Sequence, residues 1–278
     1  MLKWSSLLCF GVNGSQTPGG GSTMAKIISI INQKGGVGKT TTAVNLSALM
    51  ADMGQRVLLI DLDPQGNATS GLGMAVEDKS AYEVLMGRIQ MKDLVEKTDF
   101  KNLSIAGSDI RLADAELQLV NVDKREYRLK TALAAVQKDF DFVIIDCPPY
   151  YSASCVNAIG AADGIIIPTN TDNNSVMGVN EVVEEIGTLR DICPNAKILG
   201  CLVTVWQKSP IDEDALEHLR SECRVPVFKT VIRRSVECVR GASWEKEPIQ
   251  VNHPFCNAGK DYRAFVAELL TVLGVAYG

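Results

Sequence analysis

One short segment, residues 34–41, constrains the fold of this chain more than any other. It reads Lys-Gly-Gly-Val-Gly-Lys-Thr-Thr, follows a β-branched apolar stretch at 27–31 and precedes a run with helical spacing. Glycines at this spacing allow successive backbone N–H groups to converge on phosphate oxygens, and the N-terminus of the following helix adds a partial positive charge. The segment therefore predicts a strand, a phosphate-binding loop and a helix, in that order, around a nucleoside triphosphate, most simply ATP.

Two side chains of this loop carry chemistry of their own. Lys39 can reach the terminal phosphates, and the hydroxyl of Thr40 can ligate Mg²⁺. The strict loop pattern requires glycine where this chain has Gln33, so the segment fits a variant in which Lys34 comes first. Two lysines this close repel each other unless phosphate charges lie between them, which favours a polyphosphate ligand over a glycine-rich turn without ligand.

The rest of the chain alternates apolar strands with helices. We expect strands at 27–31, 57–61, 142–146, 164–168 and 198–205. We expect helices at 42–53, 109–120, 125–140, 152–162, 176–191, 212–222 and 258–273. Continuous apolar strands are typical of a parallel sheet that is covered on both faces. The order predicts a doubly wound α/β fold with a mostly parallel sheet, helices on both faces and ligands at the carboxyl ends of the strands. Together with the variant loop at 34–41, the expected class is a P-loop nucleoside triphosphatase of the deviant Walker A type.

Three aspartates follow two of these strands. Asp61 and Asp63 leave the second strand just before Pro64, and Asp146 ends the apolar run Phe-Val-Ile-Ile. From these positions Asp63 can orient an attacking water, and Asp146 can reach the ligand shell of Mg²⁺. The alternative is that Asp61 or Asp63 caps the turn that follows it, which is a common role of aspartate.

The loop and the carboxylates together predict an ATP hydrolase. The reaction is transfer of the γ-phosphoryl group to water, in which positioning and charge neutralisation do most of the catalysis and no covalent intermediate is needed. Without a complete set of charge-neutralising groups such sites are slow, at about 10⁻⁴ to 10⁻² per second in unaided GTPases. We therefore expect a slow, Mg²⁺-dependent basal rate that an activator raises.

Composition and charge limit the possible partners. The chain has 278 residues and a formal net charge of -5, which argues against a surface that binds nucleic acid in every state but leaves room for a local basic patch. The 8 cysteines are scattered without a Cys-Xaa-Xaa-Cys pair, so reduced thiols in a cytoplasmic protein are expected. No apolar stretch approaches the ~20 residues of a membrane span.

The first residues differ in character from the rest of the chain. Residues 1–23 contain one lysine, a short apolar patch and a run rich in glycine and serine that cannot pack as an element. The segment lacks the longer apolar core and the small-residue cleavage site of a secretory signal. We expect a disordered tail at 1–23, with Met24 as the working start, and a single ATPase domain at 24–278.

The combined motifs resemble those of the ParA/Soj partitioning ATPases, in the MinD/ParA superfamily. The similarity runs from about Lys26 to Leu273, so it does not depend on one motif. The segments that carry it lie at 34–41, 61–73 (Asp-Leu-Asp-Pro-Gln-Gly-Asn-Ala-Thr-Ser-Gly-Leu-Gly), 125–130, 144–149 (Ile-Ile-Asp-Cys-Pro-Pro) and 229–232.

This resemblance implies a mechanism in which two subunits close over two ATP molecules. Lys34 of each subunit then reaches the nucleotide of the other, while Lys39 serves its own. The resemblance also implies that Thr40 ligates Mg²⁺, that Asp146 supports the metal, and that Asp63 positions the water, so Lys34, Lys39 and Asp63 are the expected catalytic residues. The expected ATP-binding residues are Lys34, Gly35, Gly36, Val37, Gly38, Lys39, Thr40 and Thr41, the last of which contacts phosphate.

The resemblance further implies two macromolecular partners. In the family, the ATP dimer coats DNA without sequence preference, and a ParB-like protein stimulates hydrolysis and releases it, so a nucleoid-associated protein of plasmid or chromosome partition is expected. The chain departs from the family after Trp206, where Glu237 replaces an expected arginine. A basic surface for DNA can still form, with a solvated loop as the alternative. Its expected members are Lys229, Arg233, Arg234 and Arg240, together with Lys208.

Three other functions compete with partition. A MinD-like membrane positioner needs an amphipathic terminal helix with a basic face, whereas the apolar residues of 258–273 form a stripe that suits packing on a sheet, so no membrane partner is expected. An ATP-driven iron–sulfur carrier needs paired cysteines, which the scattered cysteines do not provide. The third is an ATP-gated switch that regulates transcription or a mobile element, and the sequence leaves it open.

Overall fold

A seven-stranded sheet forms the centre of the computed structural model, which describes residues 24–275; the expected tail at 1–23 lies outside the described residues. The strand order is β3-β4-β2-β5-β1-β6-β7. All neighbouring strands pair in parallel except β3, which is antiparallel to β4. The strands are β1 Lys26–Ile30, β2 Val57–Asp61, β3 Glu96–Lys97, β4 Leu103–Ala106, β5 Phe142–Asp146, β6 Gly164–Thr169 and β7 Lys197–Val203.

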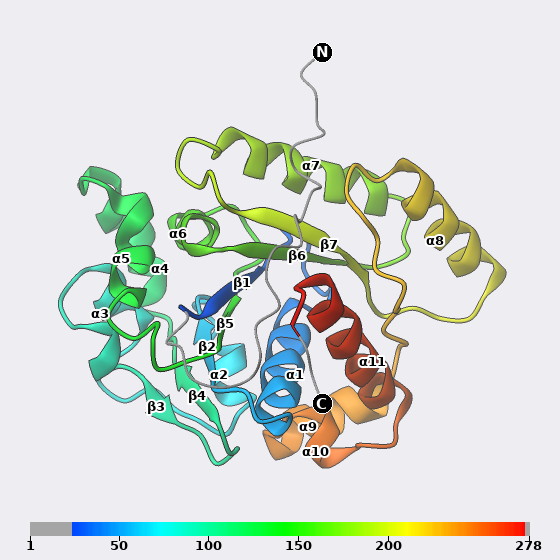
Figure 1. Cartoon of the computed structure of the whole chain (residues 1–278), viewed down its shortest axis with the longest axis horizontal. Coiled ribbons are helices and arrows are strands. Elements are labelled where there is room, and N and C mark those ends of the chain that lie inside the picture. The colour runs from blue at the N-terminus through cyan, green and yellow to red at the C-terminus, as the bar shows by residue number, and fades with distance from the viewer. Residues whose placement is uncertain (1–23, 276–278) are drawn as a thin grey trace.

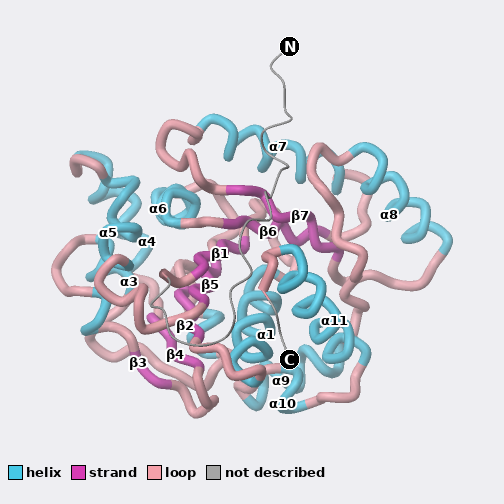
Figure 2. Tube along the Cα trace, viewed as in Figure 1, coloured by secondary structure: helices cyan, strands magenta, loops and turns pink. Residues whose placement is uncertain are grey.

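Helices connect the parallel strands and cover both faces of the sheet (Figures 1 and 2). They are α1 Lys39–Asp52, α2 Asn67–Ser70, α3 Ala81–Leu85, α4 Leu112–Gln118, α5 Arg128–Leu133, α6 Ala153–Ala161, α7 Ser175–Thr188, α8 Pro210–Glu222, α9 Val236–Glu245, α10 Ile249–Asn252 and α11 Asn257–Val272. Short 3₁₀ helices are η2 Met91–Asp93, η3 Leu119–Asn121 and η4 Arg125–Tyr127. The expected doubly wound α/β fold is thereby confirmed.

The core is divided between the two faces of the sheet because successive strand residues point to opposite sides. Leu59 and Ile144 pack with α1 and α11 on one face. Ile60 and Ile145, one residue further along the same strands, pack with helices α3 to α7 on the other. All four side chains are fully buried, which explains why these strands are apolar without interruption.

The register of the central strands determines which polar residues meet at the edge of the sheet. In the β1–β5 pair Ile30 is opposite Asp146, and in the β2–β5 pair Asp61 is opposite Asp146. The loop that follows β1 therefore starts beside two aspartates that end neighbouring strands. The expected gathering of motifs at the carboxyl edge is present.

Two expected helices are shorter than their sequence pattern suggests. The stretch 109–120 begins with a turn in which the Asp109 side chain accepts the Arg111 N–H (3.0 Å), so the α-helix starts only at residue 112. The stretch 125–140 opens as a 3₁₀ turn and is α-helical only over 128–133, after which it continues in turns. Local side-chain caps and tight turns override the helical spacing here.

Other elements were not expected at all. The strand β4 reads Leu-Ser-Ile-Ala, which is too short for a periodic signal, and its pairing with β2 makes it a strand. Helix α9 covers residues 236–245 and includes Arg240, so this arginine lies on a helix and not in the solvated loop that was the alternative. The helix has one buried residue, Ala242, so its sequence shows no continuous apolar face.

Substitution of Phe265 measures how much the packing of α11 on the sheet contributes to the free energy of unfolding. Phe265 is fully buried and meets Phe228 edge to face, with ring centroids 5.0 Å apart. Phe265→Ala should lower the free energy of unfolding by about 3–5 kcal/mol, the usual cost of removing a buried ring. Phe255→Ala is the matched control, because Phe255 is 84% exposed and should change stability by less than about 0.5 kcal/mol. Urea unfolding followed by tryptophan fluorescence measures both, and equal midpoints would contradict this packing.

Candidate functional site

The glycine-rich loop runs from the end of β1 into α1, as the sequence predicts. Gly36 and Gly38 both have φ of +73°, a left-handed conformation that other residues adopt only with strain. Gly38 precedes the first residue of α1, so the N–H groups of the first helical turn have no side-chain cap. Such uncapped groups are available to an anion at the helix N-terminus.

Lys39 folds back over this loop. Its Nζ donates a hydrogen bond to the carbonyl oxygen of Lys34 at 2.9 Å, and the residue is 7% exposed. Burial lowers the pKa of Lys39, while the nearby carboxylates, Asp146 foremost, oppose that change. The amine is therefore held above the loop, among acidic groups, in a position suited to contact with terminal phosphates.

Lys34 has partners within its own chain. Its Nζ donates to the Asn170 side chain at 3.1 Å and forms an ion pair with Asp172, both of which follow β6. Lys34 and Asp172 remain 36% and 43% exposed, so the pair lies at the surface of the carboxyl edge of the sheet. The side chain is thus not free in a single subunit, and any contact with a second subunit requires it to leave Asp172.

Two fully buried aspartates lie side by side next to the loop. Burial raises the pKa of Asp61 to about 6, against the hydrogen bonds that this carboxylate accepts from Thr69 and Asp63. Burial and the charge of Asp61 raise the pKa of Asp146 well above its usual range, and the nearby Thr40 side chain opposes that rise. Both carboxylate oxygens of Asp146 lack a hydrogen-bond partner among the described residues.

An unpaired buried carboxylate fits a site for a hard cation. Oxygen ligands are what Mg²⁺ prefers, and Thr40 and Asp146 would supply them together with phosphate oxygens. Thr40 lines the cavity described below, and Asp146 is fully buried next to the Thr40 side chain. No cluster of three or more His, Cys, Asp or Glu side chains suited to a metal occurs in residues 24–275, so the phosphates would have to complete such a site.

Asp63 starts a tight loop after β2. Its N–H donates to the Asp61 carboxylate at 3.0 Å, and its own Oδ1 accepts the Gln65 N–H at 2.9 Å. Both aspartates therefore cap turn N–H groups, which was the alternative role considered for them. Capping does not remove Asp63 from the site, because the residue also lines the cavity. Its Oδ2 takes no part in the two hydrogen bonds just described.

A cavity of about 470 Å³ opens over the loop. One wall consists of the loop, the first turn of α1 and Asp63. The opposite wall comes from the segment 232–236, from α9 and from Tyr262 of α11. The loop provides phosphate-binding groups, and Val205, Val236 and Val239 provide an apolar part, so the cavity matches a nucleotide with a charged and an aromatic end.

Two residues that sequence reasoning missed fix the loop to the sheet. Asn32 accepts the Lys34 N–H at 2.9 Å and donates to the Pro168 carbonyl at 2.7 Å. The Thr204 hydroxyl donates toward the carbonyls of Val37 (2.8 Å) and Thr169 (3.1 Å). Both are buried polar residues at strand ends, a signal visible in the sequence but shared by many loop residues.

The residues expected to bind DNA differ in exposure and in their partners. The guanidinium of Arg233 forms two hydrogen bonds with Asp261 of α11, at 2.8 and 2.7 Å. Arg234 and Arg240 are exposed and line the cavity opposite the phosphate loop. Lys229 is exposed, and its N–H donates to Glu268. Arg233 is therefore held by the fold, while the other three side chains remain candidates.

The cysteine beside this site is not poised for chemistry. Cys147 follows Asp146 directly and is fully buried. Burial raises the pKa of its thiol well above the usual value, so it is not a thiolate near neutral pH. The described cysteines, at positions 147, 155, 193, 201, 223, 238 and 256, are all free.

Fold and loop together define the class: a P-loop nucleoside triphosphatase with a deviant Walker A motif and a parallel sheet. Comparison with known proteins identifies the family within this class. Residues 25–198 match the AAA domain model AAA_31. Soj, the sporulation initiation inhibitor protein of Bacillus subtilis, is 38% identical over 88% of this chain and 98% of its own length. The chromosome partitioning protein ParA of Myxococcus xanthus is 35% identical, covering 90% of each.

Similarity to solved structures supports the fold. Cobyrinic acid a,c-diamide synthase from Mycobacterium smegmatis, crystallised with ADP and magnesium, superposes with a TM-score of 0.80 and 32% identity, over 90% of this chain and 96% of that one. The chain belongs to the ParA/Soj family of ATPases, in the MinD/ParA superfamily.

The unpaired carboxylate of Asp146 leads to a prediction about stability without ligand. In buffer with a chelator at neutral pH, Asp146→Asn should raise the melting temperature by about 2–4 °C, the shift that 1 kcal/mol produces in a chain of this size. Folding of the unmodified protein requires this carboxyl group either to be buried with its charge beside Asp61 or to take up a proton, and an amide avoids both costs. The same variant should gain less stabilisation from MgATP than the unmodified protein. Differential scanning fluorimetry measures both.

The control for this prediction is Asp141→Asn. Asp141 precedes β5 and accepts hydrogen bonds from the Arg56 side chain at 3.2 and 2.8 Å, so its replacement should lower the melting temperature. A lower melting temperature for Asp146→Asn in chelator would show that its carboxylate is stabilised in the ligand-free protein.

Proposed function

We propose that this protein is an ATP-dependent, dimerising ATPase switch of plasmid or chromosome partition. In this proposal it works in the cytoplasm, binds DNA without sequence preference in its ATP state, and releases it after hydrolysis that a ParB-like partner stimulates. The observation that carries the nucleotide part is the meeting of an uncapped glycine loop, Thr40 and the unpaired Asp146 carboxylate at one edge of the sheet. Family membership supports the partition part.

The residues of the site divide the work of hydrolysis among them. Glycine N–H groups and the N-terminus of α1 hold the phosphates, and Lys39 neutralises their charge. Mg²⁺, held through Thr40 and Asp146, would neutralise charge on the phosphate oxygens. Asp63 lines the same cavity and orients the attacking water. The basal rate is slow in this proposal because one subunit supplies a single cation, Lys39, directly at the phosphates.

A membrane role receives no support from the last helix. The large apolar residues Phe265, Val266, Leu269 and Leu270 of α11 are buried in the core cluster that the sheet and α1 share. An interfacial helix needs such a face exposed to lipid. Within the described part of the chain, no helix is long and apolar enough to cross a membrane. The DNA-binding switch is therefore the version that we propose.

Lys34 tests the dimeric part of the proposal. Lys34→Ala should bind ATP but remain monomeric, because the amine that leaves Asp172 for the nucleotide of a second subunit is gone. Sedimentation velocity with ATP, in an Asp63→Ala background that slows hydrolysis, measures the dimer. Lys26→Ala is the matched control, since Lys26 is an exposed lysine at the opposite end of β1. An ATP dimer that forms equally well with Lys34→Ala would reject the cross-subunit role.

The DNA part is tested by retention on random-sequence duplex with ATP, ADP or no nucleotide. Retention should require ATP and should be lost in Lys39→Ala. Arg234→Glu combined with Arg240→Glu should abolish retention, and neutral replacements should reduce the slope of log affinity against log salt by roughly 2, about one per lost phosphate contact.

The structure determines which arginines suit this experiment. Arg233 is excluded because its replacement would leave Asp261 unpaired and disturb the fold. Lys97→Glu with Lys101→Glu is the charge-matched control, because both lysines are exposed around β3, at the far edge of the sheet. Nucleotide binding must be verified separately, since Arg234 and Arg240 line the cavity. Equal retention with ATP and ADP would exclude the switch, and unchanged retention in the double variant at matched salt would exclude this surface.

A further inference from the structure

The loop that carries Asp63 is closed at both ends by one carboxylate. Asp61 Oδ1 accepts the Asp63 N–H at 3.0 Å, and Asp61 Oδ2 accepts the Thr69 N–H at 2.9 Å. The Thr69 hydroxyl donates to the same Oδ2 at 2.8 Å. Asp61 is fully buried and Thr69 is 4% exposed, so no water replaces these contacts readily. The backbone position of Asp63 therefore depends on where the Asp61 carboxylate is held.

Thr69 also ties this carboxylate to the next strand of the sheet. Its Oγ1 accepts the Ser108 N–H at 3.0 Å, two residues beyond the end of β4. The packing around this contact is close. A Cβ added at Gly66, which has φ of +62°, would lie 2.8 Å from the Ser108 carbonyl oxygen, and one added at Gly107 would lie 3.1 Å from the Thr69 methyl carbon. The Asp63 loop thus has little room to shift relative to the end of β4.

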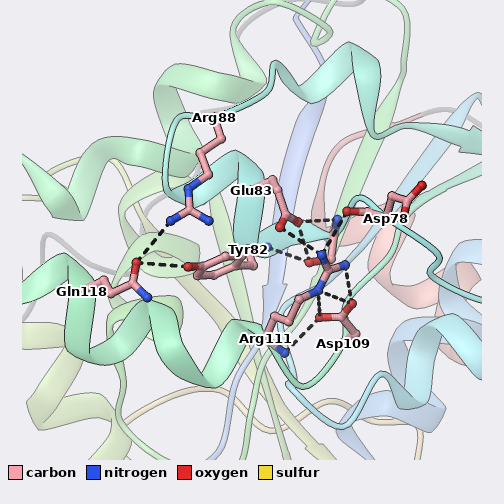
Figure 3. Close-up of polar contacts among 8 residues, drawn as sticks. Asp78, Tyr82, Glu83, Arg88, Asp109, Arg111 and Gln118 are labelled. Atoms are coloured by element: carbon pink, nitrogen blue, oxygen red, sulfur yellow. Dashed lines mark hydrogen bonds and ion pairs between the residues drawn. The ribbon is translucent and has the colours of Figure 1, made fainter.

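The end of β4 is itself fixed by a charged cluster (Figure 3). Arg111 forms an ion pair with Asp109 at 2.6 Å and another with Glu83 at 3.2 Å. The Ala81 N–H donates to the Gly107 carbonyl at 2.8 Å. Ser108 lies between these two attachments, so it is a stable point against which Thr69 can be positioned.

We propose that Thr69 is a positioning residue for hydrolysis, which holds Asp63 in place through Asp61. This proposal rests on the proposed role of Asp63 in orienting water. The Thr69 hydroxyl uses its proton for Asp61 and an oxygen lone pair for Ser108, so one group sets the distance between the ends of β2 and β4. A small misplacement of a group that aligns the attacking water lowers the rate without changing how ATP is held.

The experiment compares Thr69→Val, which keeps the shape but lacks the hydroxyl, with Thr69→Ser, which keeps the hydroxyl. Steady-state hydrolysis with saturating Mg²⁺ gives kcat and the KM for ATP. Thr69→Val should lower kcat about tenfold with KM within about twofold, as expected for loss of a hydrogen bond to a charged group. Thr69→Ser should retain kcat within about twofold. If Thr69→Val does not fold, Thr69→Cys, with its weak thiol donor, takes its place.

The control is Thr98→Val. The Thr98 hydroxyl donates to the Leu103 carbonyl at 2.9 Å in the β3–β4 turn. Leu103 pairs with Val57 at the start of β2, whereas Asp63 follows the end of β2, so loss of this hydroxyl should affect stability but not kcat. The proposal is overturned if Thr69→Val leaves kcat unchanged, if it raises KM without lowering kcat, or if Thr69→Ser is as slow as Thr69→Val. Asp63→Ala tests the underlying role of Asp63 separately. Hydrolysis at the wild-type rate in Asp63→Ala would overturn the role of Asp63, and the positioning role of Thr69 with it. Slow hydrolysis in Asp63→Ala together with an unchanged kcat in Thr69→Val would overturn the positioning role alone.

Discussion

Parallel pairing of β1 and β2 with β5 is the constraint on which the site depends. It places Ile30, Asp61 and Asp146 in one row, so the glycine loop starts beside two carboxylates. Both carboxylates are fully buried, which costs free energy unless hydrogen bonds or a cation compensate. Asp61 is compensated within the chain by Thr69 and the Asp63 N–H. Asp146 has no such partner among residues 24–275, and the compensation that it lacks is what a cation held with the phosphates would provide.

The same edge of the sheet explains how nucleotide binding can be coupled to dimerisation. Lys34 is engaged with Asn170 and Asp172 in the single subunit, at the exposed rim beyond β6. A ligand can shift the state of a protein only by the difference in its affinity for the two states. In the proposed dimer, the triphosphate bound by the second subunit would offer Lys34 more negative charge than Asp172 does. The Lys34–Asp172 ion pair that is given up is exposed, and such pairs are worth only about 0–1 kcal/mol. This exchange of partners would therefore favour the proposed dimer only when the nucleotide carries enough charge.

Sequence pattern predicted the central strands and the phosphate loop because their signals are local. An apolar run ends in Asp61 or Asp146, and glycine spacing marks the loop. The elements and contacts that the sequence did not predict have no such local signal. The strand β4 is recognisable only through its pairing with β2, and Thr69 is one polar residue among many until its hydroxyl is seen between Asp61 and Ser108. These contacts join residues 8 and 39 positions apart, so spacing rules do not reveal them.

The segment before α9 shows how tertiary contacts change the meaning of a basic sequence. Glu268 of α11 accepts the N–H groups of Lys229 and Thr230, and Asp261 accepts both the N–H and the guanidinium of Arg233. Asp261 and Glu268 of α11 thus fix the segment 229–233, and residues 232–236 line the cavity. Part of its positive charge is neutralised inside the subunit, so in the proposed switch the attraction for DNA would depend on the exposed arginines 234 and 240. Because these two also line the cavity, bound nucleotide would contact them, and the proposed ATP-dependent affinity for DNA would then require no separate switch.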